Sequence, residues 1–317
     1  MPRTFAWLLM VLGCTSGAVS VVGTAPPWLR ELGGLETHYR QTSAPDALRE
    51  LYAGRADVAL VSRPGPLPPR GIGPVVFLPV AVYPVRLAYR LPGVDLQLDL
   101  KTACRIFAGR VLTWDHREIA ALNPEVRLPS LPILTTARSV PNAASQVFAE
   151  ACVTGGWWPS TWRKSSWSAG AVNIRTRQRE QLADLRVTGS LGLLGPLEQA
   201  PDLQVARLRS PGGLFVEASV AQGVDAVPAS VYTSLAPVKD AQAYPLRGLV
   251  WAVYLREQRY RERGLQEAQA LHAFLTALQA QDSEFFTPLP EQERPSVRLT
   301  FGGRDLATFK GPPAPRP

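Results

Sequence analysis

The sequence predicts an α/β fold of two lobes, each a mixed, mainly parallel sheet flanked by helices. Short apolar runs that suit buried strands alternate along the chain with helical patterns, and this alternation is typical of parallel sheets. The 317 residues, 46% of them hydrophobic, are enough for two cores. A strong apolar run at residues 245–256 comes late, after a long excursion. We therefore expect the chain to leave the first lobe and return to it.

The first lobe is predicted to begin with a strand at residues 18–24 and a helix at residues 26–40, opened by prolines and interrupted by two glycines. A second helix is expected over residues 42–54. Ser43 precedes its first turn and can cap it, and Asp46 follows three residues later. These signals place a capped helix after the first strand.

Two further strand regions are predicted next. Residues 56–62 form a short apolar run that suits a buried strand. The stretch 74–91 predicts two strands with breaks at Pro79 and Pro84, because proline cannot donate a hydrogen bond to a sheet.

A pair of helices is predicted next. The first covers residues 100–110 and stops at Gly109. Asp115 is expected to cap the second helix, with Glu118 three residues later as in a capping box. Asn123 and Pro124 end that helix, since proline lacks the next N–H donor.

The remaining elements follow the same alternation. They are a strand at 131–138, a helix at 143–152, strands at 188–195 and 245–256, and an amphipathic helix at 267–280. The predicted division of the chain is a first lobe in two parts, 19–83 and 244–310, a second lobe at 84–243, and a flexible proline-rich tail at 311–317.

The N-terminus has the pattern of a secretory signal over residues 1–18. Arg3 precedes an apolar run, and small residues follow it. Cleavage before a lipidated Cys14 and cleavage after Ala18 by an ordinary signal peptidase both fit. The protein is thus expected in the periplasm or outside the cytoplasm, touching a membrane only through a lipid on Cys14.

Cys104 and Cys152 remain after the signal, both in helical patterns. A disulfide between them is one possibility, but the sequence does not give the distance between the two cysteines. The favoured interpretation is two small, buried, unpaired apolar side chains.

A net charge of +8 favours anionic partners. Glutamates lie among the arginines of the charge-rich segments, so no nucleic-acid partner is expected. The tryptophans of residues 155–167 are expected to fill a core or its rim. The three histidines are far apart and predict no metal site or cofactor, and no acid, base or nucleophile set marks an enzyme.

One segment resembles a known family. Residues 105–129, "RIFAGRVLTWDHREIAALNPEVRLP", followed by "ARSVPNAASQVF" at 137–148, resemble the phosphate-binding protein of bacterial phosphate ABC importers. That family consists of two-lobed type II periplasmic binding proteins. The resemblance implies an inorganic oxyanion, most simply phosphate, held between the lobes by helix N-termini and hydroxyls, and an ABC transporter permease as partner.

The resemblance places candidate ligands on two loops that open onto helices, where unpaired N–H groups attract anions. Arg138 ends its strand and can bind an oxyanion through paired hydrogen bonds. The other candidates are Ser139, Asn142, Ser43, Ser62, Arg63 and Thr24.

The sequence also departs from the family at this site. Val140, Ala143 and Ala144 stand in the anion loop where the family has an acid and hydroxyl or glycine donors, and Ser62 stands in place of a carboxylate. An alternative therefore stays open, in which the fold is kept while an altered or lost site serves a sensory or protein-interaction module. Phosphate-ester hydrolysis is a third, weaker hypothesis.

Overall fold

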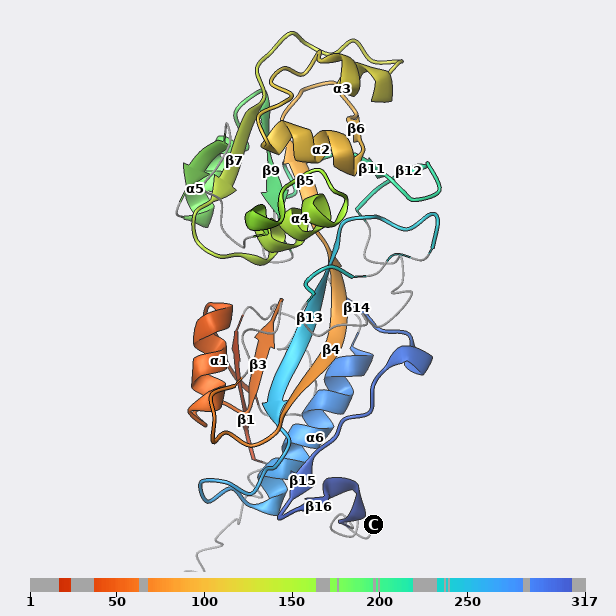
Figure 1. Ribbon diagram of the computed structural model, residues 1–317. Helices are drawn as coiled ribbons and strands as arrows, with labels where there is room; N and C mark the ends of the chain where they lie inside the picture. Colours follow the sequence, from red (N-terminus) through yellow and green to blue (C-terminus); the bar gives the residue numbers. More distant parts are fainter. Residues whose placement is uncertain are drawn as a thin grey trace, which may run out of the picture.

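The computed structural model shows an elongated molecule with one main sheet in each half (Figure 1). We call the half built on the six-stranded sheet the lower half and the half built on the five-stranded sheet the upper half, as they stand in Figure 1. The structure describes residues 17–23, 37–62, 68–163, 172–175, 177–195, 198, 200–218, 233–236, 238, 240–281 and 286–309.

The lower sheet has the order β14-β4-β13-β3-β1-β2. Its strands are β1 (Val19–Gly23), β2 (Thr37–Gln41), β3 (Val58–Val61), β4 (Val75–Pro84), β13 (Arg247–Leu255) and β14 (Thr287–Pro288). β1 pairs parallel with β2 and β3, whereas β13 runs antiparallel to β3 and β4.

Two helices cover the two faces of this sheet, α1 (Ala44–Tyr52) and α6 (Leu265–Ala280). Alternate residues of a strand point to opposite faces. Val58 and Leu60 accordingly join the core that contains the buried face of α6, and Ala59 and Val61 join the core of α1. The continuous apolar run of β3 is explained by burial on both sides.

The upper sheet has the order β10-β5-β9-β7-β8. Its strands are β5 (Arg86–Tyr89), β7 (Leu134–Arg138), β8 (Val172–Arg175), β9 (Ser190–Leu194) and β10 (Gln204–Val205). Its helices are α2 (Leu100–Phe107), α3 (Arg117–Leu122), α4 (Ala143–Thr154) and α5 (Gln178–Asp184). β7 pairs parallel with β8 and β9, while β5 runs antiparallel to β9 and β10.

Small elements complete the described chain. A three-stranded sheet contains β6 (Gln97–Leu98), β11 (Arg207–Arg209) and β12 (Phe215–Val216), and a hairpin contains β15 (Thr300–Phe301) and β16 (Arg304–Asp305). Short 3₁₀ turns lie at Ser160–Trp162, Glu291–Glu293 and Leu306–Thr308. The α/β fold with helix-flanked mixed sheets is confirmed, although antiparallel pairs are more frequent than the mainly parallel prediction implied.

Among the described residues, two adjacent segments connect the lower sheet with the upper half. Only Val85 separates β4 in the lower sheet from β5 in the upper sheet. The returning segment lies beside it, because Val85 N–H donates to the Leu246 carbonyl (2.9 Å) and Tyr244 donates to the Val85 carbonyl (2.9 Å). The predicted lobe boundaries, after residues 83 and 243, stay a prediction.

Two local predictions on the lower half are changed by pairing. Residues 37–41 form strand β2 instead of the end of a helix, because they pair in register with β1. β4 continues through Pro79, where a register shift opposite Val250 and Trp251 accommodates the missing N–H. The other residues of the predicted 26–40 helix lie outside the described residues, as do the tail and nearly all of the predicted signal.

The helix pair of the upper half is largely as predicted. α2 is followed by Gly109 in the left-handed region (φ 69°), as expected for its stop. The predicted Asp115 cap is wrong, because His116 is the N-cap and its Nδ1 accepts from the Glu118 N–H (3.3 Å). Glu118 pairs with Arg105 across the two helices (2.9 Å).

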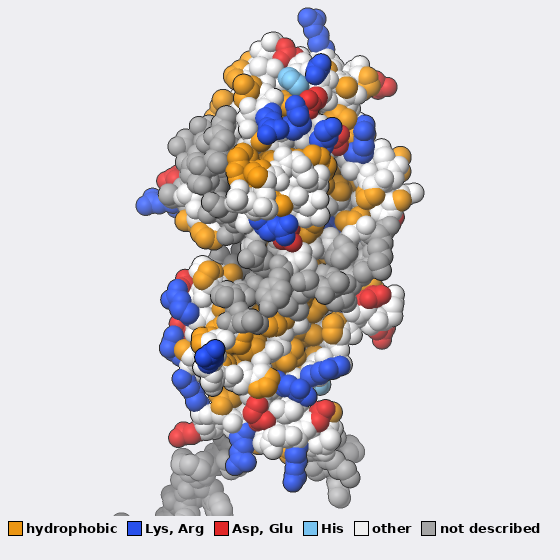
Figure 2. Space-filling view, viewed as in Figure 1, with side chains coloured by type: hydrophobic (Ala, Val, Ile, Leu, Met, Phe, Trp, Pro, Cys, Tyr) orange, Lys and Arg blue, Asp and Glu red, His pale blue; other side chains and the backbone are white. Residues whose placement is uncertain are grey.

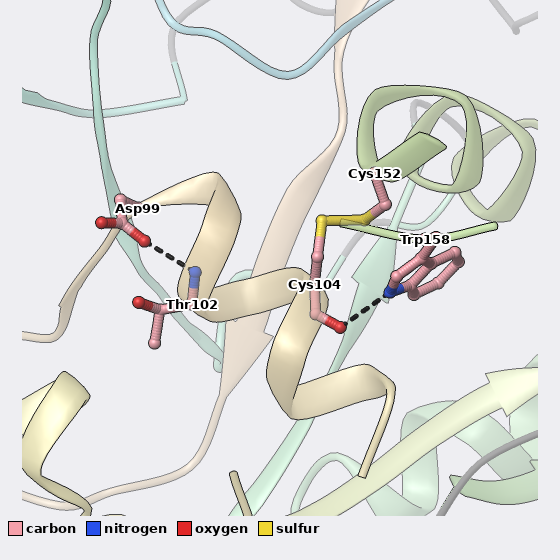
Figure 3. The surroundings of a disulfide bond; sticks show 5 residues. All are labelled: Asp99, Thr102, Cys104, Cys152 and Trp158. Carbon is pink, nitrogen blue, oxygen red and sulfur yellow. Dashed lines mark hydrogen bonds between the residues drawn. A yellow bond between two sulfur atoms is a disulfide. The ribbon is translucent and has the colours of Figure 1, made fainter. Parts of the chain in front are cut away.

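Cys104 and Cys152 form a disulfide that joins α2 to α4 (Figure 3). The interpretation as two unpaired thiols is therefore wrong, since the fold brings the two Cα atoms to 5.7 Å. Trp158 covers the bridge, is 6% exposed, and donates to the Cys104 carbonyl (2.9 Å). It also packs edge-on to Phe148, so it fills the core as expected for this tryptophan cluster.

Candidate anion-binding site

The parallel strands of both halves point their carboxyl ends at the junction between the halves. In Figure 1 the arrowheads of β3 and β7 point toward each other. Loops at the carboxyl ends of parallel strands are where α/β proteins place their ligand sites. The residues that follow these strands are therefore the candidates for a ligand site.

Arg138 is the last residue of β7 and lies just before the loop to α4. Its side chain is only 15% exposed and donates to Oε1 of Glu198 at 2.6 Å. Glu198 is itself 5% exposed at its side chain, so this is a buried ion pair. A short charge-assisted hydrogen bond of this kind fixes the direction of the guanidinium.

Glu198 is held on its second oxygen as well. Oε2 accepts from the Gly195 N–H at 2.6 Å. Arg86, on the adjacent strand β5, donates to the backbone carbonyls of Glu198 (2.7 Å) and Gly195 (3.3 Å). Two arginines, from the strands on either side of β9, thus converge on one buried carboxylate and its turn.

This carboxylate lies next to the first turn of α4. A Cβ placed on Gly195 would lie 2.8 Å from Oε2 of Glu198 and 3.5 Å from Cβ of Ala144. Any side chain at residue 195 would therefore collide with the carboxylate. The N-terminal turn of a helix attracts negative charge through its unpaired N–H groups.

Asn142 is the N-cap of α4. Its Oδ1 accepts from the Ser145 N–H (2.9 Å) and its Nδ2 donates to the Val140 carbonyl (3.1 Å). Both ends of the amide are therefore engaged in local structure. Ser139 is half-buried between Arg138 and Val140.

The candidates from the lower half lie at the carboxyl edge of its parallel strands. Gly23 of β1 pairs with Gln41 of β2 and with Leu60 of β3, so Ser43 and Ser62 each lie two residues beyond that register. Ser62 is 5% exposed.

Ser43 caps α1, where it accepts from the Asp46 N–H (3.3 Å) and donates to the Asp46 carboxylate (2.6 Å). The remaining two candidates, Thr24 and Arg63, lie outside the described residues. The described lower-half candidates thus share one strand edge with each other, and neither forms a hydrogen bond with Arg138.

Tyr83, at the end of β4, is a further buried polar group near this site. It is 1% exposed, and its hydroxyl has no hydrogen-bond partner among the described residues. Burial and the negative charge of Glu198 both raise the pKa of Tyr83. A carboxylate of the upper half therefore acts electrostatically on a strand of the lower half.

Sequence reasoning did not find Glu198, Arg86 or Tyr83. Arg86 meets the Gly195 turn only through the antiparallel register that pairs it with Leu194. The sequence contains one signal for this ion pair. Glu198 is an acidic residue three positions after the apolar strand at 188–195, and a carboxylate buried there requires a partner.

Three other features of the described part of the chain are metal-ligand groups, apolar helices and the distribution of charge. No group of His, Cys, Asp and Glu side chains there is arranged to hold a metal ion. None of its helices combines the length and the apolar composition needed to cross a bilayer. On the face shown in Figure 2, Lys and Arg side chains are spread over both halves with acids among them, rather than gathered in one stripe.

Comparison with solved structures defines the class to which this architecture corresponds. The chain has the fold of two-lobed phosphate-binding proteins. It matches a DING protein with a TM-score of 0.63 at 17% identity, over 87% of this chain and 92% of that one. It matches a phosphate ABC transporter substrate-binding protein from Clostridium perfringens, solved with bound phosphate, with a TM-score of 0.56 at 12% identity, over 86% and 100% of the chains.

Sequence comparison adds a shorter match. Phosphate-binding protein PstS 2 of Mycobacterium tuberculosis is 33% identical over 84 residues. That stretch is 25% of this chain and 23% of the length of the relative. No family model matches the chain. The comparisons thus establish the fold of the chain.

Proposed function

We propose that this protein is an extracytoplasmic solute-binding protein that captures an inorganic oxyanion, phosphate most readily, and delivers it to an ABC permease. The observation that carries the proposal is the place of Arg138. It is a largely buried arginine, 15% exposed, at the carboxyl end of a parallel strand and before the N-terminus of α4, and this strand end points to the junction of the halves. Structural neighbours with this fold include proteins solved with phosphate bound.

In the proposed complex the upper half supplies the N–H groups of Arg138 not used by Glu198, together with Ser139 and the first turn of α4. Asn142 acts there through the cap that orients this turn. The lower half supplies Ser43 and Ser62, and Thr24 and Arg63, which lie outside the described residues, stay candidates from the sequence. A tetrahedral anion has acceptors on all sides, so donors from two halves can hold it and bring the halves together.

The disulfide supports the proposed compartment. Bridges such as Cys104–Cys152 form and persist in oxidising environments, outside the bacterial cytoplasm. The signal pattern of residues 1–18 agrees with that location, through either a lipid on Cys14 or release after Ala18.

A second function is favoured by one specific contact. The Arg138 guanidinium is already paired with a carboxylate of the same chain. The fold would then serve a sensory or protein-interaction module whose oxyanion site has been altered. Titration calorimetry with phosphate and sulfate separates the two functions, because the module needs neither ion.

The decisive variant is Arg138→Lys, which keeps the positive charge beside Glu198 but removes the planar fork. We expect phosphate to bind at least about tenfold more weakly, as for loss of one charge-assisted hydrogen bond. Arg186→Lys is the matched control, since Arg186 lies in the same half in an exposed pair with Asp202. An absence of heat and of thermal shift with either anion at millimolar concentration would remove the transport function.

A further inference from the structure

The side chain of Glu198 is itself an oxyanion in a site built for one. Its two oxygens take the guanidinium of Arg138 and the N–H of Gly195, each at 2.6 Å. A Cβ placed on Gly195 would stand 2.8 Å from its Oε2 and 3.5 Å from Cβ of Ala144 in the first turn of α4, and the Glu198 side chain is 5% exposed. These are the kinds of donor that an inorganic oxyanion would use here.

We infer that Glu198 is an internal competitor that lowers the affinity of the site for every external oxyanion. This inference rests on the proposed function and concerns the same site. An incoming anion either displaces the carboxylate from Arg138 or binds beside it. Both routes cost free energy, because two negative charges a few ångströms apart repel strongly where water is excluded.

A purely structural role for Glu198 predicts the opposite change in anion affinity when this residue is replaced. If Glu198 served only to aim Arg138, its loss would leave the guanidinium loose, and anions would bind more weakly. If it competes, its loss frees Arg138 and the Gly195 N–H, and anions bind more tightly. The sign of the change in affinity therefore separates the two roles.

Tyr83 is a fully buried group within the electrostatic reach of Glu198, and its hydroxyl lacks a hydrogen-bond partner among the residues that the structure describes. A carboxylate that leaves Arg138 without gaining a new partner becomes an isolated buried charge, which is costly. This cost adds to the penalty that an external anion meets at the site.

The test is titration calorimetry of phosphate and of sulfate into the intact protein, comparing Glu198→Gln with the unmodified chain. We expect at least about tenfold tighter binding of both ions to E198Q, from removal of one nearby like charge. Asp202→Asn is the matched control, because it removes one negative charge from an exposed pair in the same half. That control should change affinity less than about twofold, as for a screened surface charge.

Glu198→Asp guards against a variant that fails to fold. It keeps the counter-charge of Arg138 but is one methylene shorter, so it competes less well and should bind phosphate more tightly than the unmodified chain. Equal or weaker binding by both variants, with the unmodified chain binding phosphate, overturns this inference and leaves the transport function standing. Absence of binding in all variants overturns both.

Discussion

At the scale of single residues, Glu257 shows how a carboxylate organises the C-terminal hairpin. It accepts hydrogen bonds from the backbone of Arg259, Gly302 and Gly303 and from the hydroxyl of Thr300, all between 2.8 and 2.9 Å. Burial alone would raise its pKa, but these hydrogen bonds outweigh burial and lower the pKa to about 2. Gly302 and Gly303 both have positive φ, which places their N–H groups around the carboxylate.

The first residue-scale prediction concerns acid. A pKa that is lower in the folded chain than in the unfolded chain means a stabilisation that is complete above the unfolded value of 4.5 and lost as pH falls toward 2. Glu257→Gln should therefore lower the free energy of unfolding by about 1–3 kcal/mol at pH 7, with the difference shrinking below pH 4.5. Denaturant unfolding at several pH values measures this.

Glu291→Gln serves as the control for Glu257, because Glu291 is exposed. A constant difference between Glu257→Gln and the unmodified chain from pH 7 to pH 2.5 would show that the carboxylate charge is not what stabilises the hairpin.

Residues also show what sequence can and cannot supply. The Ser43 cap was predicted because its partner, Asp46, is three residues away and the pattern is local. The Arg138 partner was not, since Glu198 is 60 residues away and meets it only when β7 and β9 pair. Local hydrogen bonds can be predicted from a sequence, whereas a long-range ion pair can be predicted only when the register of the sheet is known.

At the scale of elements, the disulfide fixes α2 against α4. Cys104 and Cys152 are separated by 48 residues, and both are fully buried. Cross-linking a loop of this length removes entropy from the unfolded chain worth about 4 kcal/mol. The bridge also fixes the body of the helix whose first turn lies beside Arg138 and Glu198.

We therefore predict that Cys104→Ala with Cys152→Ala lowers the free energy of unfolding by about 2–4 kcal/mol. Denaturant titration of the double variant, compared with the unmodified chain with and without reductant, gives the value. Reductant should destabilise the unmodified chain and leave the double variant unchanged. Equal stability of the two proteins under oxidising conditions would contradict the prediction.

The elements also show why sequence patterns predict some segments correctly and others wrongly. The sequence predicts a helix that includes β2, whereas pairing with β1 makes these residues a strand. The break expected at Pro79 is absent because the partner strand β13 absorbs the proline with a register shift. Helices such as α4 and α6 follow from periodicity because their own residues determine them. Edge strands and bulges depend on partners.

At the scale of the whole molecule, a third link joins the halves beside the two strand crossings. Glu150 on α4 is 5% exposed and accepts from the Thr233 hydroxyl (2.7 Å) and the Ser234 N–H (3.0 Å). The segment 233–236 is paired with β13 of the lower sheet, for Leu249 N–H donates to the Ser234 carbonyl (3.0 Å). One carboxylate of the upper half thus holds a segment of the lower half.

This link predicts how the halves respond when it is cut. Glu150→Ala leaves the Ser234 N–H buried without its acceptor, so the free energy of unfolding should fall by about 2–4 kcal/mol. The same change removes the hydrogen bonds that join α4 to the segment 233–236, and small-angle scattering of the ligand-free protein should give a larger radius of gyration than the unmodified chain. Glu125→Ala, at an exposed position of the upper half, should change neither quantity. If Glu150→Ala lowers stability but leaves the radius of gyration unchanged, the crossings at Val85 and Leu246 alone set the relation of the halves, and Glu150 stabilises without restraining them.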